Sequence, residues 1–160
     1  NPTQLLEEVV ELYQAQHPGH ITLNIEGALH EIEADSDRLR QILNNLIKNG
    51  LESCGEKRVA DVTLRASTEG ATLRIKICDN GGGIEESLRS QIFEPYATTK
   101  PKGTGLGLAI VKRIIEEHNG EIELIDREQG SCFLLQLPNR HHTNNPNQIE
   151  MSLEEKSSQT

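Results

Sequence analysis

Residues 59–84 read VADVTLRASTEGATLRIKICDNGGGI. Two runs of alternating apolar and polar residues flank a Glu-Gly turn, which is the pattern of a β-hairpin. In the second run Leu73, Ile75 and Ile77 alternate with polar residues, so we expect one face of the hairpin to be buried. This run ends at Asp79, and the three glycines that follow shortly after it indicate that the strand stops at a loop.

Other segments of the chain predict helices as well as strands. Apolar residues at helical spacing, followed by stop signals, predict three substantial helices. These are residues 1–16, 35–54 and 107–119, with a short helix at 86–93 and further strands at 20–27, at 30–35 and in a hairpin within 121–138. The apolar stripe of the first helix comprises Leu5, Leu6, Val9, Val10, Leu12 and Tyr13. After the last helix we expect Gly120 to take the left-handed cap conformation.

Most of these strands are joined by hairpins and do not alternate regularly with helices. This order predicts an α+β fold, a two-layer α/β sandwich in which a mixed, mostly antiparallel sheet carries three main helices on one face. We assign residues 1–138 to this domain. Residues 139–160 are polar and lack periodicity, so we expect a mostly disordered C-terminal tail there.

The composition limits the possible classes of function. The chain has 160 residues, enough for one domain with a hydrophobic core, and its formal net charge is -9. An acidic chain cannot easily build the basic face that nucleic acid requires, so nucleic acid is not an expected partner. No apolar run approaches the length of a membrane span, so we expect no membrane contact by these residues. The start without Met suggests a piece of a longer protein.

The cysteines predict a reducing environment. Cys54, Cys78 and Cys132 are odd in number and show no C-x-x-C spacing, which disfavours a disulfide framework and a zinc site. We therefore expect reduced thiols and a cytoplasmic domain.

Three asparagines in the expected helix 35–54 suggest a polar function for one of its faces. Asn44, Asn45 and Asn49 lie within six residues, although asparagine is mildly unfavourable inside helices. Asn45 and Asn49 are four residues apart and so share a face, where their amide oxygens suit Mg²⁺. The alternative is a polar face that bonds a neighbouring loop.

Two loops add groups that suit a nucleotide. A carboxylate such as Asp79 can accept from the exocyclic amine of adenine, although a plain Asx turn is the commoner role of such a residue. Glycines before the helix at 107 suit an anion at a helix N-terminus, with a flexible hinge as the alternative. The preceding Thr98, Thr99, Lys100 and Lys102 could bind a terminal phosphate from a mobile lid, or form a solvated loop.

Four ordered motifs together carry a resemblance to a known family. These are DRLRQILNNLIKN, DNGGGI, FEPYATTK and GTGLGLAIV. In this order they resemble the N, G1, F and G2 boxes of the catalytic ATP-binding domain of sensor histidine kinases, within the GHKL superfamily and its Bergerat fold. The chain looks most similar to nitrogen-regulatory sensors of the NtrB and NtrY type. The resemblance covers residues 1–138.

The resemblance implies roles for individual residues. It makes Asn49 the Mg²⁺ ligand with Asn45 in support, and it makes Lys100 a phosphate contact. It implies that Asp79 reads the adenine amine, with Gly81 and Gly83 shaping the base pocket, and that Phe93 anchors the lid. The remaining nucleotide contacts that it implies are Thr98, Thr99, Lys102, Gly103, Thr104, Gly105, Leu106, Gly107 and Ser131.

Departures from the family pattern bear on mechanism. Hydrolysing members of the superfamily carry a Glu where this chain has Asn45, and an amide cannot serve as a general base. Gly82 replaces a usual proline, which should loosen its loop, and Ala97 replaces a usual bulkier residue, which should weaken docking of the lid. The phosphoacceptor motif of the family is absent, and His30 only mimics its first letters.

The function implied is transfer of the γ-phosphoryl group of Mg-ATP to a histidine on a separate dimerisation domain of the same two-component kinase. A response regulator would be an indirect partner. We expect this piece to be monomeric and the parent protein to be a homodimer, with membrane anchoring of the parent left open. The alternatives are an ATPase of the same superfamily and a nucleotide-dependent switch that binds a protein.

Overall fold

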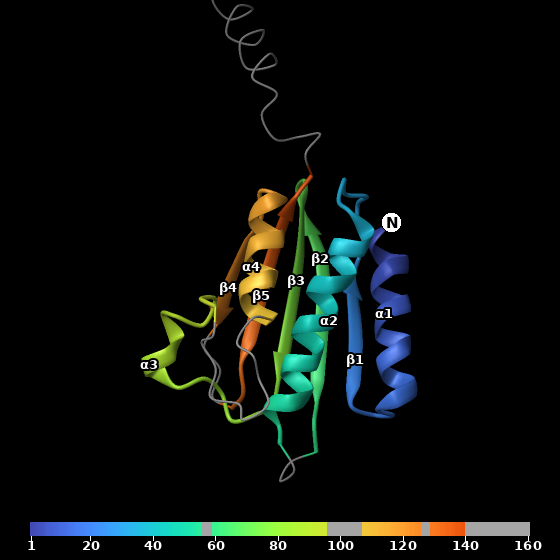
Figure 1. Cartoon of the computed structure of the whole chain (residues 1–160). Helices are drawn as coiled ribbons and strands as arrows, with labels where there is room; N and C mark the ends of the chain where they lie inside the picture. Colours follow the sequence, from blue (N-terminus) through green and yellow to red (C-terminus); the bar gives the residue numbers. More distant parts are fainter. Residues whose placement is uncertain (56–58, 96–106, 126–128, 140–160) are drawn as a thin grey trace, which may run out of the picture.

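The structure is a computed structural model, and it describes residues 1–55, 59–95, 107–125 and 129–139. Within these ranges the structure contains four helices and five strands, which are labelled in Figure 1. They are α1 (Pro2–Gln16), β1 (Ile21–Glu26), α2 (Ser36–Ser53), β2 (Val62–Glu69), β3 (Thr72–Asp79), α3 (Glu86–Arg89), α4 (Gly107–Glu117), β4 (Glu121–Ile125) and β5 (Cys132–Pro138).

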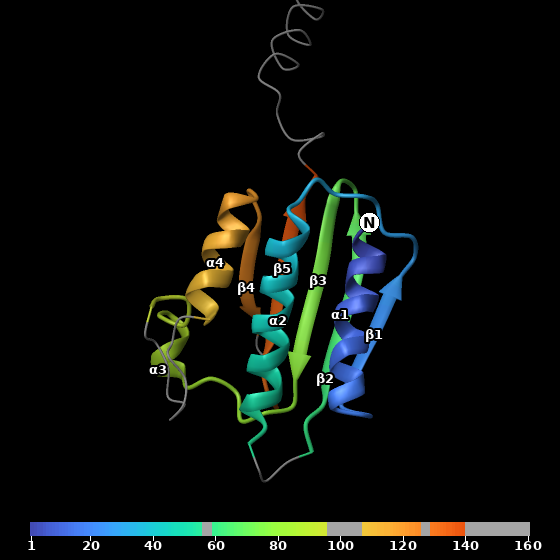
Figure 2. The same ribbon diagram turned by 45° about the vertical axis from the view of Figure 1, so that its right-hand side comes forward.

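The strands form a single mixed sheet in the order β1-β2-β3-β5-β4. β1 pairs with β2 in parallel, and the other three pairs are antiparallel. Helices α1, α2 and α4 lie side by side on one face of this sheet in both ribbon views, Figure 1 and Figure 2. The predicted two-layer α+β sandwich with three main helices on one face is therefore confirmed.

The hydrophobic core lies between the sheet and the helices because strand side chains alternate between the two faces. In β3 the residues Leu73, Ile75 and Ile77 are buried, as the alternation in the sequence predicts. The largest fully buried side chains are Phe133, Leu6, Ile42, Leu43, Leu46, Ile47, Leu64, Leu73, Ile75, Ile114, Ile115 and Leu135. An aliphatic layer therefore joins both arms of the central hairpin to all three main helices.

Helix α1 begins at a side-chain cap, where Asn1 accepts hydrogen bonds from the backbone N–H groups of Thr3 and Gln4. Its predicted apolar stripe is mostly buried. The assignment of Leu12 to that stripe is wrong, because Leu12 is 63 % exposed. Leu12 falls outside the stripe formed by Leu5, Leu6, Val9 and Val10, so it points away from the sheet.

Residues 30–35, which we expected to form a strand, are irregular. The alternation in this segment still has a physical basis, because Ile32 packs against the core while its neighbours do not. The backbone of this segment bonds side chains instead of a neighbouring strand: the N–H of His30 donates to Oγ1 of Thr68, and the carbonyl of Glu31 accepts from the side-chain amide of Asn139. The segment carries the chain from β1 to Asp35, whose side chain caps the N-terminus of α2.

The C-terminus of α4 differs from the prediction in one residue. Asn119, and not Gly120, takes the left-handed conformation, with φ 57°. The N–H of Gly120 donates to the carbonyl of Ile115, and that of Asn119 to the carbonyl of Glu116, which together make a Schellman cap. Gly120 is needed for space, because a Cβ there would lie 2.5 Å from the carbonyl oxygen of Gln136 in β5.

The cysteines do not match the prediction of three reduced thiols. Cys78 and Cys132 form a disulfide, although 54 residues separate them in sequence, and Cys54 is a buried free thiol. The register explains the pairing, because Cys78 on β3 lies directly opposite Cys132 on β5.

One residue of the predicted C-terminal tail contacts the domain. Asn139, which we assigned to the tail, is tied to the domain by a bond from its N–H to the carbonyl of Ala71. The rest of the predicted tail lies outside the described residues. In the ranges that the structure describes, no helix is both long and apolar enough to cross a membrane.

Candidate functional site

A buried carboxylate ends the central strand of the sheet. Asp79 is the last residue of β3 and only 3 % exposed. Its Oδ2 accepts from the hydroxyl of Ser131 at 2.9 Å, and its Oδ1 accepts from the N–H of Gly81 at 2.9 Å. Burying a carboxylate is costly unless hydrogen bonds satisfy it, so these donors fix the orientation of the Asp79 side chain.

Ser53 adds a second hydroxyl to this cluster. It is the last residue of α2, and its Oγ lies 3.1 Å from Oδ1 of Asp79 and 2.9 Å from the carbonyl oxygen of Gly50. The sequence analysis missed Ser53. Its position four residues after Asn49, on the same helix face, is the signal that could have identified it.

Glycines allow the helix, the strand and the loop to approach one another at Asp79. A Cβ on Gly81 would lie 2.7 Å from the carbonyl oxygen of Ser53, so the loop packs directly on the end of α2. A Cβ on Gly50 would lie 3.1 Å from Val62, which shows how closely α2 approaches the sheet. Gly83 has φ +77°, a conformation that side chains rarely adopt. Of the two predicted glycines, Gly81 is therefore needed for close packing beside Asp79, and Gly83 is needed for its backbone conformation.

Asn80 ties the loop to the segment that follows α2. Its Oδ1 accepts from the N–H of Asp61 at 2.9 Å, and its amide nitrogen donates to the carbonyl of Val59 at 2.9 Å. The thiol of Cys54 also lies 2.9 Å from Oδ1 of Asn80. The loop after β3 is thus held to the end of α2 and to the start of β2.

The asparagines of α2 lie on the same helix as Ser53. Asn45 and Asn49 are half-buried, and the amide nitrogen of Asn45 lies 3.4 Å from the carbonyl oxygen of Gly107, the first residue of α4. Because this contact uses the donor end of the amide, the acceptor end of Asn45 is the one suited to a cation. The backbone carbonyl of Asn44 accepts a hydrogen bond from the hydroxyl of Tyr13 in α1.

The ligands available near these amides are mainly oxygen atoms of amides. Among the residues that the structure describes, no group of three or more His, Cys, Asp or Glu side chains could hold a metal ion. A divalent cation here would rely on amide oxygens, water and ligand phosphates. Mg²⁺ is commonly bound in this way, so the donor set fits it.

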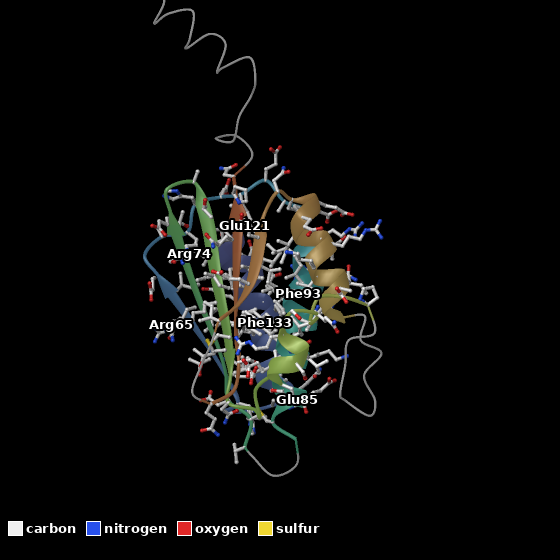
Figure 3. All side chains as sticks on the ribbon, turned by 90° about the vertical axis from the view of Figure 1, so that its left-hand side faces the viewer. Arg65, Arg74, Glu85, Phe93, Glu121 and Phe133 are labelled. Atoms are coloured by element: carbon white, nitrogen blue, oxygen red, sulfur yellow. A yellow bond between two sulfur atoms is a disulfide. The ribbon has the colours of Figure 1, made fainter. Side chains whose placement is uncertain are left out.

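Phe93 lies beyond α3 and packs against the core. Its ring meets Phe133 of β5 edge to face, with the centroids 6.0 Å apart, and Figure 3 shows the two rings near each other. Nζ of Lys112 in α4 lies 5.6 Å from the centroid of the Phe93 ring, within cation–π range. Phe93 therefore joins the segment after α3 to both β5 and α4.

The structure brings together one part of the predicted site and does not describe the other. Gly81 and Ser131 both bond the carboxylate of Asp79, and Asn45 contacts the start of α4. The predicted phosphate contacts at Thr98, Thr99, Lys100, Lys102, Gly103, Thr104, Gly105 and Leu106 lie outside the described residues, as does Ala97.

A two-layer sandwich with a buried acid at the end of its central strand, a glycine loop beside the acid and asparagines on the facing helix defines a class of nucleotide-binding domain. The chain belongs to the family described as histidine kinase-, DNA gyrase B-, and HSP90-like ATPase, whose model matches residues 34–141. Within this family it is the ATP-binding catalytic domain of a sensor histidine kinase.

The curated proteins that are similar to this chain in sequence include sensor histidine kinases. Sensor histidine kinase ZraS of Escherichia coli strain K12 is 48 % identical over 111 residues, which are 69 % of this chain and 23 % of ZraS. A putative NtrY-like sensor histidine kinase of Rickettsia bellii is 36 % identical over 104 residues, 65 % of this chain and 17 % of that protein. The chain thus spans about a quarter or less of these relatives. The expected likeness to NtrY-type sensors is found, with ZraS at higher identity.

Solved structures of histidine kinases are also similar to this chain in fold. The nucleotide-free catalytic domain of histidine kinase ThkA has a TM-score of 0.78 and 32 % identity, covering 87 % of this chain and 95 % of that one. Full-length ShkA in complex with AMPPNP has a TM-score of 0.76 and 32 % identity over 86 % of this chain and 30 % of ShkA. ThkA in complex with response regulator TrrA has a TM-score of 0.76 and 28 % identity, covering 90 % of this chain and 42 % of that one.

Proposed function

We propose that this domain binds Mg-ATP and transfers the γ-phosphoryl group to a histidine on a dimerisation domain of the same two-component kinase. The observation that carries the proposal is the buried Asp79 carboxylate, fixed by Ser131, Ser53 and the N–H of Gly81. The complex of the related ShkA with a nucleotide analogue supports ATP as the ligand.

Adenine recognition follows from the chemistry of Asp79. A carboxylate accepts hydrogen bonds and does not donate them, so it favours the exocyclic amine of adenine over the carbonyl group at the same position of guanine. Because its orientation is already fixed by protein donors, little side-chain entropy is lost when the base binds. This is the physical basis for choosing ATP over GTP.

The phosphates would lie toward Asn49, Asn45 and the start of α4. Amide oxygens of Asn49 and Asn45 would hold Mg²⁺, which neutralises phosphate charge when it is bound. The N-terminus of α4 at Gly107 would add a partial positive charge. Lys100 and the glycines before residue 107 remain predicted phosphate contacts, and Phe93 remains the predicted anchor of the lid.

Phosphoryl transfer needs positioning and charge neutralisation more than covalent help from the protein. Asn45 occupies the place where hydrolysing relatives are expected to carry a Glu, and an amide does not take a proton from water near neutral pH. The domain would therefore hold ATP with little hydrolysis until a histidine is supplied.

The substitution Asp79→Asn tests adenine recognition. We expect it to weaken ATP binding by about 1.5 to 3 kcal/mol, the range for a hydrogen bond to a charged group, which is roughly a tenfold to a hundredfold rise in Kd. Calorimetric titration of the purified domain with ATP and with GTP measures the effect. GTP binding should not weaken, because the amide of Asn can donate to the guanine carbonyl.

The matched control is Asp61→Asn, which changes an exposed carboxylate at the start of β2. It should leave ATP binding as in the parent chain. If Asp79→Asn binds ATP as tightly as the parent chain and the protein is folded by circular dichroism, Asp79 does not read the adenine amine.

Phosphotransfer is tested by mixing the domain with the histidine-containing domain of its own kinase and γ-labelled Mg-ATP. We expect label on that domain, little free phosphate from the catalytic domain alone, and later transfer to a response regulator, a partner class supported by the ThkA–TrrA complex. Rapid phosphate release in isolation, with no labelled histidine, would instead identify an ATPase.

A further inference from the structure

The disulfide lies directly beside the predicted nucleotide contacts. Cys78 immediately precedes Asp79 on β3, and Cys132 immediately follows Ser131 at the start of β5. The hydroxyl of Ser131 donates to the carboxylate of Asp79, and the N–H of Asp79 donates to the carbonyl of Ser131. The covalent bond and the hydrogen bonds thus join the same two strand ends.

The register explains why the two sulfur atoms meet. Because the backbones of Asp79 and Ser131 are hydrogen-bonded, the adjacent pair Cys78 and Cys132 is a non-hydrogen-bonded pair. Backbones approach most closely at such pairs, and the Cα atoms of the two cysteines lie 4.1 Å apart. The pairing therefore follows from the sheet itself.

The disulfide can be reached without entering the nucleotide site. Side chains alternate along β3, so Cys78 lies on the face opposite the helices, while Asp79 points toward α2. Arg74, four residues before Cys78, lies with Arg65 on this face of the sheet, away from the helices, as Figure 3 shows. Cys78 is partly exposed, whereas Cys132 is buried. A small thiol would therefore attack at Cys78.

A domain that uses ATP works in the reducing compartment of the cell, where disulfides are usually transient and redox-sensing rather than structural. This step rests on the proposed function. Three cysteines that form one pair and leave one free thiol suit a switchable bond and not a disulfide framework. Cys54 is not part of the pair, since its thiol contacts Asn80.

We propose that Cys78 and Cys132 form a site of reversible thiol oxidation that sets the affinity of the domain for ATP, with tighter binding in the disulfide form. A bonded S–S pair is about 2.05 Å apart, whereas non-bonded heavy atoms keep roughly 3.5 to 4.0 Å. Reduction therefore moves the two sulfur atoms apart next to Asp79 and Ser131, and in this proposal the movement loosens the hydrogen bonds that orient the carboxylate.

The proposed reaction is thiol–disulfide exchange with a dithiol reductant. One thiolate of the reductant attacks Sγ of Cys78, the bond between the cysteines breaks, and the Cys132 thiolate leaves and takes a proton. The second thiolate of the reductant then displaces Cys78, which is also protonated, and the reductant becomes a disulfide. Two electrons and two protons pass to the protein, and an oxidised dithiol reverses the reaction.

The test measures thiol number and ATP affinity on the same samples of the purified domain. Oxidised protein should show one titratable thiol after denaturation, Cys54, and protein treated with dithiothreitol should show three. By calorimetry, the Kd for Mg-ATP should rise about threefold to tenfold on reduction, the size of one weakened hydrogen bond, and should recover on reoxidation.

Two variants separate the pair from the third cysteine. Cys54→Ser should keep the full redox response of ATP affinity, whereas Cys78→Ser should abolish it and leave its two remaining thiols reduced in both treatments. The comparison of oxidised with reduced wild-type protein needs neither variant. It decides whether the disulfide controls ATP affinity even if a variant fails to fold.

The outcomes also separate this proposal from the proposed function. Three thiols in protein treated with oxidised glutathione, with ATP still bound, would overturn the redox site and leave the kinase assignment intact. If oxidised protein with one thiol and reduced protein with three thiols bind Mg-ATP with equal Kd values, the disulfide does not control ATP affinity. One thiol with no ATP binding in either state would overturn the proposed function, and the control of affinity with it.

Discussion

At the scale of single residues, the site depends on how Asp79 is held. Its hydroxyl donors come from two elements that are distant in sequence, Ser53 at the end of α2 and Ser131 before β5. Each donor lowers the cost of burying the carboxylate and narrows its range of orientations. We therefore propose that Ser53 acts through Asp79 as a positioning residue for the base.

Removing the Ser53 hydroxyl should weaken nucleotide binding without changing the fold. We expect Ser53→Ala to lower the binding free energy of ATP by about 0.5 to 1.5 kcal/mol, the net value of one hydrogen bond. Calorimetry measures this, with Ser87→Ala on the exposed face of α3 as the matched control. An unchanged Kd in the Ser53 variant would show that the hydroxyl bonds only Gly50 and does not position Asp79.

At the scale of elements, two neighbouring residues have different roles where the chain passes from α4 to β4. Asn119 reverses the chain in the left-handed conformation, and Gly120 then passes close beneath β5. Asparagine tolerates positive φ better than most residues, so the glycine is free to serve the close contact. The dipeptide predicts a helix end correctly, but it does not predict which residue takes which role.

A Cβ at position 120 should destabilise the domain. In Gly120→Ala it would lie 2.5 Å from the carbonyl oxygen of Gln136 and 2.8 Å from the side chain of Leu137, so β5 must shift. We expect a loss of about 1 to 3 kcal/mol, typical of overpacking, in urea unfolding. Asn119→Gly is the opposite control and should not destabilise, because φ 57° suits glycine. Equal stability of Gly120→Ala and the parent chain would contradict this account.

At the scale of the whole molecule, stability depends on joining α1 to the rest of the helical layer. Arg40 of α2 forms a salt bridge with Glu8 of α1, and this bond lowers the pKa of the Glu8 carboxyl. Tyr13 of α1 packs against the core, and its hydroxyl donates to the carbonyl of Asn44. Burial, together with the negative charge of Glu52, raises the pKa of the Tyr13 hydroxyl above its usual 10.

The raised pKa of Tyr13 predicts a loss of stability in alkali. The folded state favours the neutral phenol, so its contribution is fully present below the unfolded pKa of about 10 and is lost as pH rises through the higher folded pKa. Urea unfolding of the parent chain between pH 9 and pH 11.5 should therefore show a steeper fall in unfolding free energy than Tyr13→Phe. Parallel pH profiles of the two proteins would count against a buried phenol.

Much of the fold could be predicted because its signals are local. Alternation in β3 and helical periodicity in α2 each appear within one short window and need no partner to be recognised. Residues 30–35 show the limit of this signal, because alternation requires only that one side chain be buried, whereas a strand also requires a backbone partner. Leu12 shows a similar limit, since an apolar residue next to a helical stripe can still point to solvent.

The sequence by itself determined the α+β class, the position of Asp79 at a strand end and the asparagine face of α2, because each of these depends on neighbours along the chain. Only the tertiary structure decided that Ser53 and Ser131 meet at Asp79, and that Cys78 pairs with Cys132. The physical reason is that strand register and helix–sheet packing bring together residues tens of positions apart. Local sequence patterns do not predict which of these distant residues will be in contact.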